Sequence, residues 1–171
     1  MTKALIFLAL LWSSFAMGQD IWMTPNQGQW DSRVDYAVDV AQGKLYLEQD
    51  GMCFFLTDVM SHDESHGHSH EVEESEHLIN YHAIKQNFIG AQSSIHSGNG
   101  KSDYYKNYLI GNDPSKWKKN VFSYNEVLYP GLYEGIDLLY LGQKGQLSYN
   151  FLVRPESNIG QIAFDFEGAK S

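Results

Sequence analysis

Apolar and polar residues alternate along most of the chain with the period of two that is typical of β-strands. Between Gln146 and Arg154, the alternation puts Leu147, Tyr149, Phe151 and Val153 on one face of a predicted strand. The same pattern recurs over residues 34–40 and 162–166, and apolar runs predict further strands over 44–48, 52–57, 78–88 and 121–128. The pattern therefore predicts an all-β fold, mostly antiparallel, built as a sandwich or as a twisted sheet packed on itself.

Two segments carry clear turn signals. The glycine-containing stretch 142–145 separates two alternating segments, 136–140 and 147–153, and predicts a hairpin with a short loop. One helical start is convincing, because Asp113 stands as an N-cap directly before Pro114. We expect one short helical turn near 113–119, which places Trp117 against the sheet.

The first 18 residues have the composition of an export signal. Lys3 supplies a positive charge, residues 4–12 form an apolar run, and residues 16–18 (Ala-Met-Gly) resemble a cleavage site with small residues. This apolar run is too short to span a bilayer, which requires about 20 residues. We therefore expect a Sec-type signal peptide over 1–18, a mature β-rich domain over 19–171, no transmembrane helix, and a secreted or cell-surface location.

One segment departs from the β pattern. Residues 61–76 contain four histidines and six acidic residues but only one apolar side chain, which predicts a disordered, solvated loop between two strands. Within it, His66, His68 and His70 alternate, so in an extended chain they would project from one face about 6.6 Å apart. Imidazoles in this arrangement are weak candidates for opportunistic zinc binding. We expect no dedicated cofactor.

Composition narrows the range of functions. With 43% hydrophobic residues the chain has enough apolar surface to build a core. Its net charge of −9 argues against a nucleic-acid partner, which calls for clustered Lys and Arg. A single cysteine excludes an intramolecular disulfide framework.

Two further sets of residues are candidates for chemistry or binding. Glu134 and Asp137 have the residue types of a glycosidase couple, but an Asp in this position more often bonds backbone amides in a turn, so we predict no enzyme activity. Tyr104, Tyr105 and Trp117 are weak candidates for contacts with a sugar face or a partner protein. The alternative is that these aromatic side chains fill the core.

Several strings, taken in order, resemble an N-terminal domain of unknown function found in large surface proteins of Bacteroidota. The resemblance begins at NQGQW and is strongest in the segment from Tyr105 to Trp117, and it covers nearly all of the mature chain. The chain departs from the family at 156–159, where the family has a Pro-Gly turn, and at Ser171, where family members continue with further strands. The His-rich segment is not part of the family pattern and looks like a local insertion. The strings that carry the resemblance are NQGQW (26–30), NFIGA (87–91), YKNYLIGNDPSKW (105–117), VLYPGLYEGIDL (127–138), and the segments 147–153 and 162–168.

The resemblance implies a place in a larger protein. Members of that family continue into β-propeller-type repeats and often end in a gliding-motility or type IX secretion sorting domain, so we expect the domain to be incomplete at its C-terminus. Our hypothesis is a non-catalytic cell-surface module that acts by binding, scaffolding or adhesion, with an extracellular glycan or protein as partner. The alternatives are a carbohydrate-binding module associated with an enzyme and a metal-binding surface protein that uses the His-rich loop.

Overall fold

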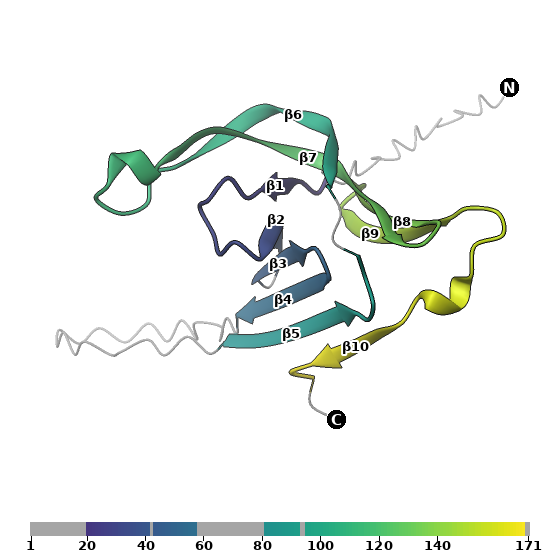
Figure 1. Cartoon of the computed structure of the whole chain (residues 1–171). Helices are drawn as coiled ribbons and strands as arrows, with labels where there is room; N and C mark the ends of the chain where they lie inside the picture. The colour runs from purple at the N-terminus through teal and green to yellow at the C-terminus, as the bar shows by residue number, and fades with distance from the viewer. Residues whose placement is uncertain (1–19, 42, 58–80, 93–94, 170–171) are drawn as a thin grey trace, which may run out of the picture.

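The computed structural model describes residues 20–41, 43–57, 81–92 and 95–169 (Figure 1). The predicted signal peptide and the predicted His-rich loop lie outside these residues. No helix in the described part of the chain is long and apolar enough to cross a membrane. The elements in chain order are β1 (Met23–Pro25), β2 (Val34–Val40), β3 (Gly43–Glu48), β4 (Gly51–Thr57), β5 (Tyr81–Phe88), β6 (Ser97–Tyr108), the 3-10 turn η1 (Pro114–Lys116), β7 (Lys118–Tyr133), β8 (Ile136–Gln143), β9 (Gln146–Val153), the 3-10 turn η2 (Ile159–Gln161) and β10 (Phe164–Glu167).

The ten strands form one antiparallel sheet that curls into a half-barrel (Figure 1). The strand order is β10-β5-β4-β3-β2-β1-β7-β8-β9, and β6 pairs separately with β7. The short strand β1 lies between two ribbons of strands, β10-β5-β4-β3-β2 on one side and β7-β8-β9 on the other. Met23 of β1 is opposite Val38 of β2 and Tyr124 of β7. The mostly antiparallel β class is thus confirmed, in the form of one sheet packed on itself.

The curl brings the two ends of the sheet face to face across an apolar interior. The ring of Phe88 in β5 lies 5.9 Å from that of Phe151 and 6.4 Å from that of Tyr149, both in β9. The side-chain amide of Gln86 in β5 donates to the Tyr149 hydroxyl at 3.4 Å. The buried cluster inside the curl comprises Met23, Tyr36, Val38, Leu45, Leu47, Met52, Phe88, Val127, Tyr129, Leu132, Tyr133, Ile136, Leu138 and Tyr140.

β6 and β7 form a long hairpin that extends beyond the rest of the sheet and carries η1 near its tip (Figure 1). Aromatic contacts tie this arm to the N-terminal segment, since Tyr108 packs edge-on against Trp30 with ring centroids 5.4 Å apart. Lys106 also reaches Asp39 of β2 at 3.1 Å. Hydrogen bonds from Lys44 and Lys106 lower the pKa of Asp39.

Turn predictions agree with the structure, whereas some strand boundaries differ. Lys144 (φ 52°) and Gly145 (φ 75°) form the two-residue turn between β8 and β9. Asp113 caps η1 by accepting a hydrogen bond from the Ser115 amide at 3.0 Å. β7 is much longer than the predicted segment 121–128, while β6 and η2 were not predicted.

Candidate functional site

The predicted aromatic candidates pack against different neighbours. Tyr104 and Tyr105 are consecutive in β6, where the pairing with β7 is irregular between Lys101 and Tyr105. Tyr104 packs edge-on against Trp22, with ring centroids 5.7 Å apart, and remains 47% exposed. Tyr105 packs against Phe122 at an interplanar angle of 63° and is 53% exposed. Each tyrosine thus contacts its aromatic neighbour edge-on and forms no flat stacked pair with it.

Trp117 lies at the tip of the arm, immediately after η1. Its indole N–H donates to the carbonyl of Gly111 at 3.1 Å, and its side chain is half-buried. This hydrogen bond fastens the indole to its own loop. Among the described residues, the Trp117 indole makes no ring contact with Tyr104 or Tyr105, whose ring contacts are with Trp22 and Phe122.

The carboxylates of Glu134 and Asp137 have different environments. Asp137 accepts a hydrogen bond from the Gly131 amide at 2.7 Å and lies 3.3 Å from the Arg154 guanidinium. Glu134 is exposed in the two-residue turn between β7 and β8. The predicted backbone-bonding role of Asp137 is confirmed.

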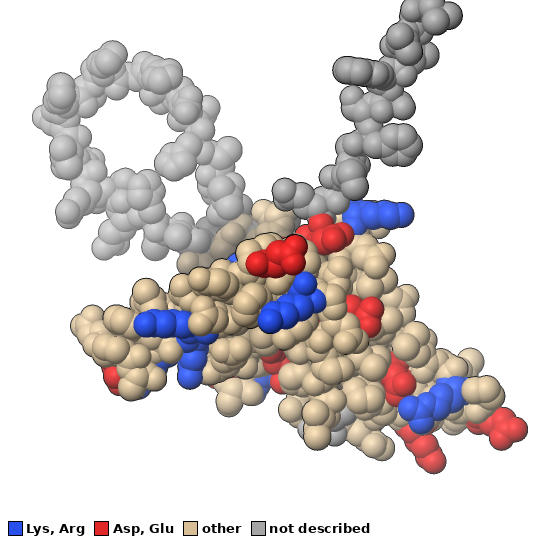
Figure 2. Space-filling view, turned by 90° about the horizontal axis from the view of Figure 1, so that it is seen from above, with Lys and Arg blue, Asp and Glu red and all other residues tan. Residues whose placement is uncertain are grey.

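The metal candidates His66, His68 and His70 lie outside the described residues. Among the residues that the structure describes, no three His, Cys, Asp or Glu side chains are grouped so that they could hold a metal ion. On the face viewed in Figure 2, basic and acidic side chains are interspersed with uncharged ones, with no continuous basic patch.

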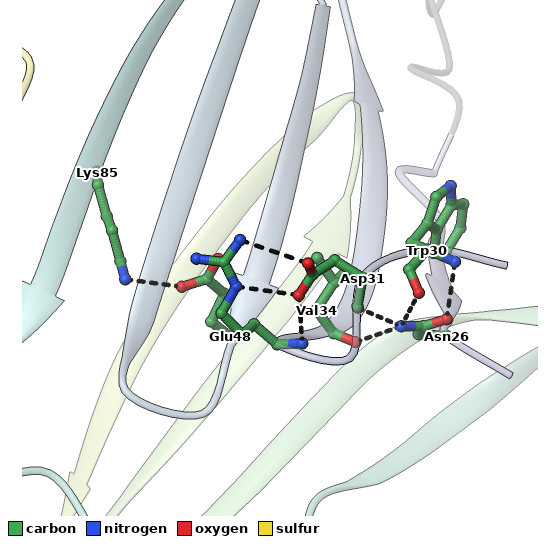
Figure 3. Close-up of polar contacts among 7 residues, drawn as sticks. Asn26, Trp30, Asp31, Val34, Glu48 and Lys85 are labelled. Atoms are coloured by element: carbon green, nitrogen blue, oxygen red, sulfur yellow. Dashed lines mark hydrogen bonds and ion pairs between the residues drawn. The ribbon is translucent and has the colours of Figure 1, made fainter. Parts of the chain in front are cut away.

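The NQGQW segment forms a loop between β1 and β2 that is organised by its own side chains (Figure 3). The side-chain amide of Asn26 donates to the carbonyls of Asp31 and Val34, each at 2.8 Å, and more weakly to that of Trp30 at 3.4 Å. Its oxygen accepts from the amides of Gly28 at 2.9 Å and Trp30 at 3.2 Å. Gly28 has φ 102°, in the left-handed region that favours glycine. This motif is therefore explained by local structure.

A half-buried polar cluster around Asp35 was missed by the sequence analysis. The Asp35 carboxylate lies 3.1 Å from Nε2 of His96 and accepts a hydrogen bond from the Tyr129 hydroxyl at 3.2 Å. The other ring nitrogen of His96 lies 3.4 Å from the Tyr36 hydroxyl. Because Asp35 sits where the β2–β3 register shifts, its side chain departs from the strand alternation. The sequence itself gave no local signal of this cluster, because residues 34–40 alternate regularly.

The cluster joins three separate parts of the fold. Its members come from β2, from β7 and from the segment before β6. The His96 ring also packs against the rings of Tyr36 and Tyr129, with centroid distances of 5.1 Å and 5.3 Å. Since both ring nitrogens have partners, this arrangement is well suited to fixing the chain between β5 and β6.

β10 forms one edge of the sheet, next to β5, with no described strand on its other side. Phe164 and Phe166 are in register with Phe88 and Gln86 of β5, so they project from the inner face of the sheet. Both inner-face neighbours in β5 are buried, whereas Phe164 is 46% and Phe166 is 55% exposed. The apolar inner face thus continues onto β10, where described residues leave about half of each ring exposed.

The backbone of β10 also has unused hydrogen-bonding directions. The Ile89 amide donates to the Ala163 carbonyl at 2.8 Å, just before the strand begins. Hydrogen-bonded and non-bonded pairs alternate along an antiparallel ladder. Asp165 consequently directs its backbone groups toward β5, while Phe164 and Phe166 direct theirs toward the outer edge, where no described strand is paired.

Comparison with known proteins gave one match. A family model described as a domain of unknown function, DUF7948, matches residues 23–171. Neither the curated proteins nor the solved structures contained a match to the chain.

Proposed function

The chain belongs to the family of this domain of unknown function, and from its geometry we propose that it is a non-catalytic binding or scaffolding module of a bacterial surface protein. It recognises an extended partner segment that adds a strand to β10. The observation that supports this proposal is the edge of β10, where exposed apolar side chains and backbone groups that no described strand pairs occur on the same two residues, Phe164 and Phe166. The surface location rests on the composition of residues 1–18 and on the family resemblance.

Strand addition explains why these features occur together. Backbone hydrogen bonds to an exposed sheet edge provide affinity, and alternate side chains provide specificity. A partner strand paired with β10 would place every second side chain beside Phe164 and Phe166 on the inner face. It would also satisfy the outward backbone groups, which have no described strand as neighbour.

The acidic side chains on the outer face of β10 restrict the charge that the partner segment can carry. Asp165 and Glu167 project from the outer face, and the Asn87 side chain donates to them at 3.0 Å and 2.7 Å. Like charges opposite one another on neighbouring strands are destabilising. The preferred partner is therefore a segment with apolar residues on one face and basic or neutral polar residues on the other.

The test uses the exported chain and a synthetic probe peptide. Mass spectrometry of the exported protein is expected to find Gln19 at the N-terminus, and retention of residues 1–18 would contradict export by signal cleavage. The probe is a peptide of about eight residues, a common strand length, in which Val and Lys alternate. Fluorescence anisotropy is expected to show saturable binding, weakened when Glu replaces Lys in the peptide.

Variants of β10 separate edge pairing from nonspecific apolar contact. Phe166→Pro removes an outward amide but spares the ladder to β5, a position where an edge strand tolerates proline. The matched variant Phe166→Thr removes the same ring and keeps the amide. We expect the proline variant to bind about tenfold more weakly than the threonine variant. Equal binding by the two variants, or undiminished binding of a backbone N-methylated peptide, would overturn the proposed mode.

A further inference from the structure

β9 forms the second edge of the sheet, at the opposite end of the strand order from β10. It pairs with β8 over its whole length, and no described strand lies on its other side. Two of its inner-face side chains, Tyr149 and Val153, are 40% and 42% exposed. The sheet therefore ends in two edges whose apolar inner faces are only partly covered by described residues.

The backbone of β9 alternates in the same phase as that of β10. The Arg154 amide donates to the Gly135 carbonyl at 3.0 Å, immediately after β9 ends. Because bonded pairs alternate along an antiparallel ladder, the odd-numbered residues of β9 direct their backbone groups away from β8. Tyr149 and Phe151, whose rings reach Phe88, belong to this set. In β9 as in β10, the inner-face residues are thus the ones whose backbone groups point to the outer edge.

This shared phase allows the two edges to pair with each other. In an antiparallel ladder, two residues that exchange backbone hydrogen bonds stand directly opposite and have their side chains on the same face. A β9 edge and a β10 edge can therefore join with both apolar inner faces on one side of a continuous sheet. A mismatch of one residue would instead place apolar side chains beside the polar outer ones.

The charges of the two edges are complementary. Residues 138–155, which contain β9, include Lys144 and Arg154 and no acidic residue. β10 carries Asp165 and Glu167 and no basic residue. The Arg154 side chain remains 64% exposed beside its ion-pair partner in β8. β9 therefore fits the partner described above, with apolar residues on one face and basic or neutral polar residues around the other.

The same charges disfavour the pairing of like edges. Antiparallel pairing of β10 with β10 of another copy would be two-fold symmetric and would set acidic side chains opposite one another on the outer face. Like charges in such positions are destabilising. Pairing of β9 with β9 would bring no opposite charges together. The combination of β9 with β10 is the one that both the apolar faces and the charges favour.

We propose that the strand added to β10 is β9 of a second copy of this chain, so that copies assemble head to tail into a continuous sheet. This inference rests on the proposed function, because it assigns the partner of the same β10 edge. Each joint uses a different edge of the two copies, so one β9 edge and one β10 edge stay open at the ends. Assembly can therefore continue beyond a dimer.

Sedimentation velocity of the exported protein over a concentration series tests this assembly. We expect dimers and longer species to increase with concentration. Val153→Pro removes an outward amide of β9 and spares the ladder to β8, as Phe166→Pro does in β10. Each proline variant alone should associate about tenfold more weakly than the threonine variant at the same position. An equimolar mixture of the two proline variants should form a heterodimer at unmodified affinity and nothing larger, because each copy retains the edge that the other lacks.

A second pair of variants changes only the charge of the β9 edge. Asn150 lies on the outer face of β9 and is exposed, so its replacement leaves the core intact. Asn150→Glu should weaken association about fivefold, because it faces the acidic outer face of β10. Asn150→Lys is the matched variant and should strengthen association. Equal association by these two variants would contradict pairing of β9 with β10.

The remaining outcomes separate this inference from strand addition itself. Undiminished association of Val153→Pro alone, or a mixture of the proline variants that forms no heterodimer, would overturn head-to-tail pairing. A protein that stays monomeric at every concentration would also overturn it. If that monomer still binds the peptide of alternating Val and Lys, strand addition at β10 stands and only the second copy as partner fails. If it binds no peptide, the proposed function fails as well.

Discussion

At the scale of single residues, several side chains are explained by the backbone that they organise. Asn26 bonds to backbone groups along the whole β1–β2 loop, and Asp137 holds the amide of Gly131 at 2.7 Å. Both residues lie in strings that carry the family resemblance. Those strings therefore report the requirements of the fold at these positions, and they do not by themselves indicate a ligand.

Asn26→Asp should destabilise the protein by about 2–4 kcal/mol, because it replaces an amide donor by a carboxylate facing the carbonyls of Asp31 and Val34. Urea unfolding followed by circular dichroism measures the change in the free energy of unfolding. The matched control is Gln27→Glu, an equivalent change of charge on an exposed neighbouring residue. Equal midpoints for the two variants would contradict the role assigned to the Asn26 amide.

The Asp35 cluster shows what local sequence patterns do not contain. Asp35 is separated from its partners His96 and Tyr129 by 61 and 94 residues, respectively. A short-range alternation reveals which face a residue occupies but carries no information on which distant residues share that face. The sequence therefore does not predict that the Asp35 carboxylate, the His96 imidazole and the Tyr129 hydroxyl meet, because the closure of the sheet brings them together.

At the scale of elements, β7 shows that a turn signal does not always end a strand. The predicted segment stops at Leu128, shortly before Pro130 and Gly131, and proline and glycine punctuate most strands. In the structure β7 continues through them to Tyr133, with Gly131 at φ 65° and a register shift between Tyr129 and Tyr133. Proline is compatible with a strand at such an irregularity. β6 was missed because its sequence, SGNGKSDYYKNY, lacks regular apolar alternation.

The β8–β9 turn offers a test in the stabilising direction. Lys144 and Gly145 both have positive φ, as a type I′ turn requires, and Asn is much better suited than Lys to the first position. Lys144→Asn should raise stability by about 0.5–1 kcal/mol, measured as an increase in the thermal midpoint. Lys144→Val is the control, because a β-branched residue at positive φ should lower the midpoint. A destabilised Asn variant would contradict the turn geometry.

At the scale of the whole molecule, tyrosines dominate the polar part of the core. Tyr36, Tyr129 and Tyr140 are each at most 4% exposed. Desolvation raises the pKa of Tyr36 to about 12, and it raises those of Tyr129 and Tyr140 as well. An unfolded tyrosine ionises near pH 10. Folding therefore opposes ionisation of these phenols.

Stability should consequently be retained below about pH 10 and fall as the pH rises toward 12, because the unfolded chain loses phenolic protons first. For Tyr36 alone, the rise of the pKa from about 10 in the unfolded chain to about 12 in the folded protein corresponds to about 3 kcal/mol of folding free energy. Urea unfolding at a series of pH values measures this loss, and Tyr36→Phe should reduce the pH dependence. A free energy of unfolding that stays constant between about pH 9 and pH 12 would contradict the buried state of these phenols.

The short strand β1 has a consequence for how the protein reaches its native state. It bonds β2 near the start of the chain and β7 more than halfway along, and the Thr24 and Ser123 hydroxyls that meet there are 99 residues apart in sequence. Each ribbon beside it consists largely of neighbouring hairpins, which form through local encounters. Uniting the ribbons instead requires the closure of a loop of about a hundred residues, and such nonlocal contacts slow folding. The rate-limiting step should therefore be the docking of two partly formed ribbons onto β1, after β7 has been synthesised.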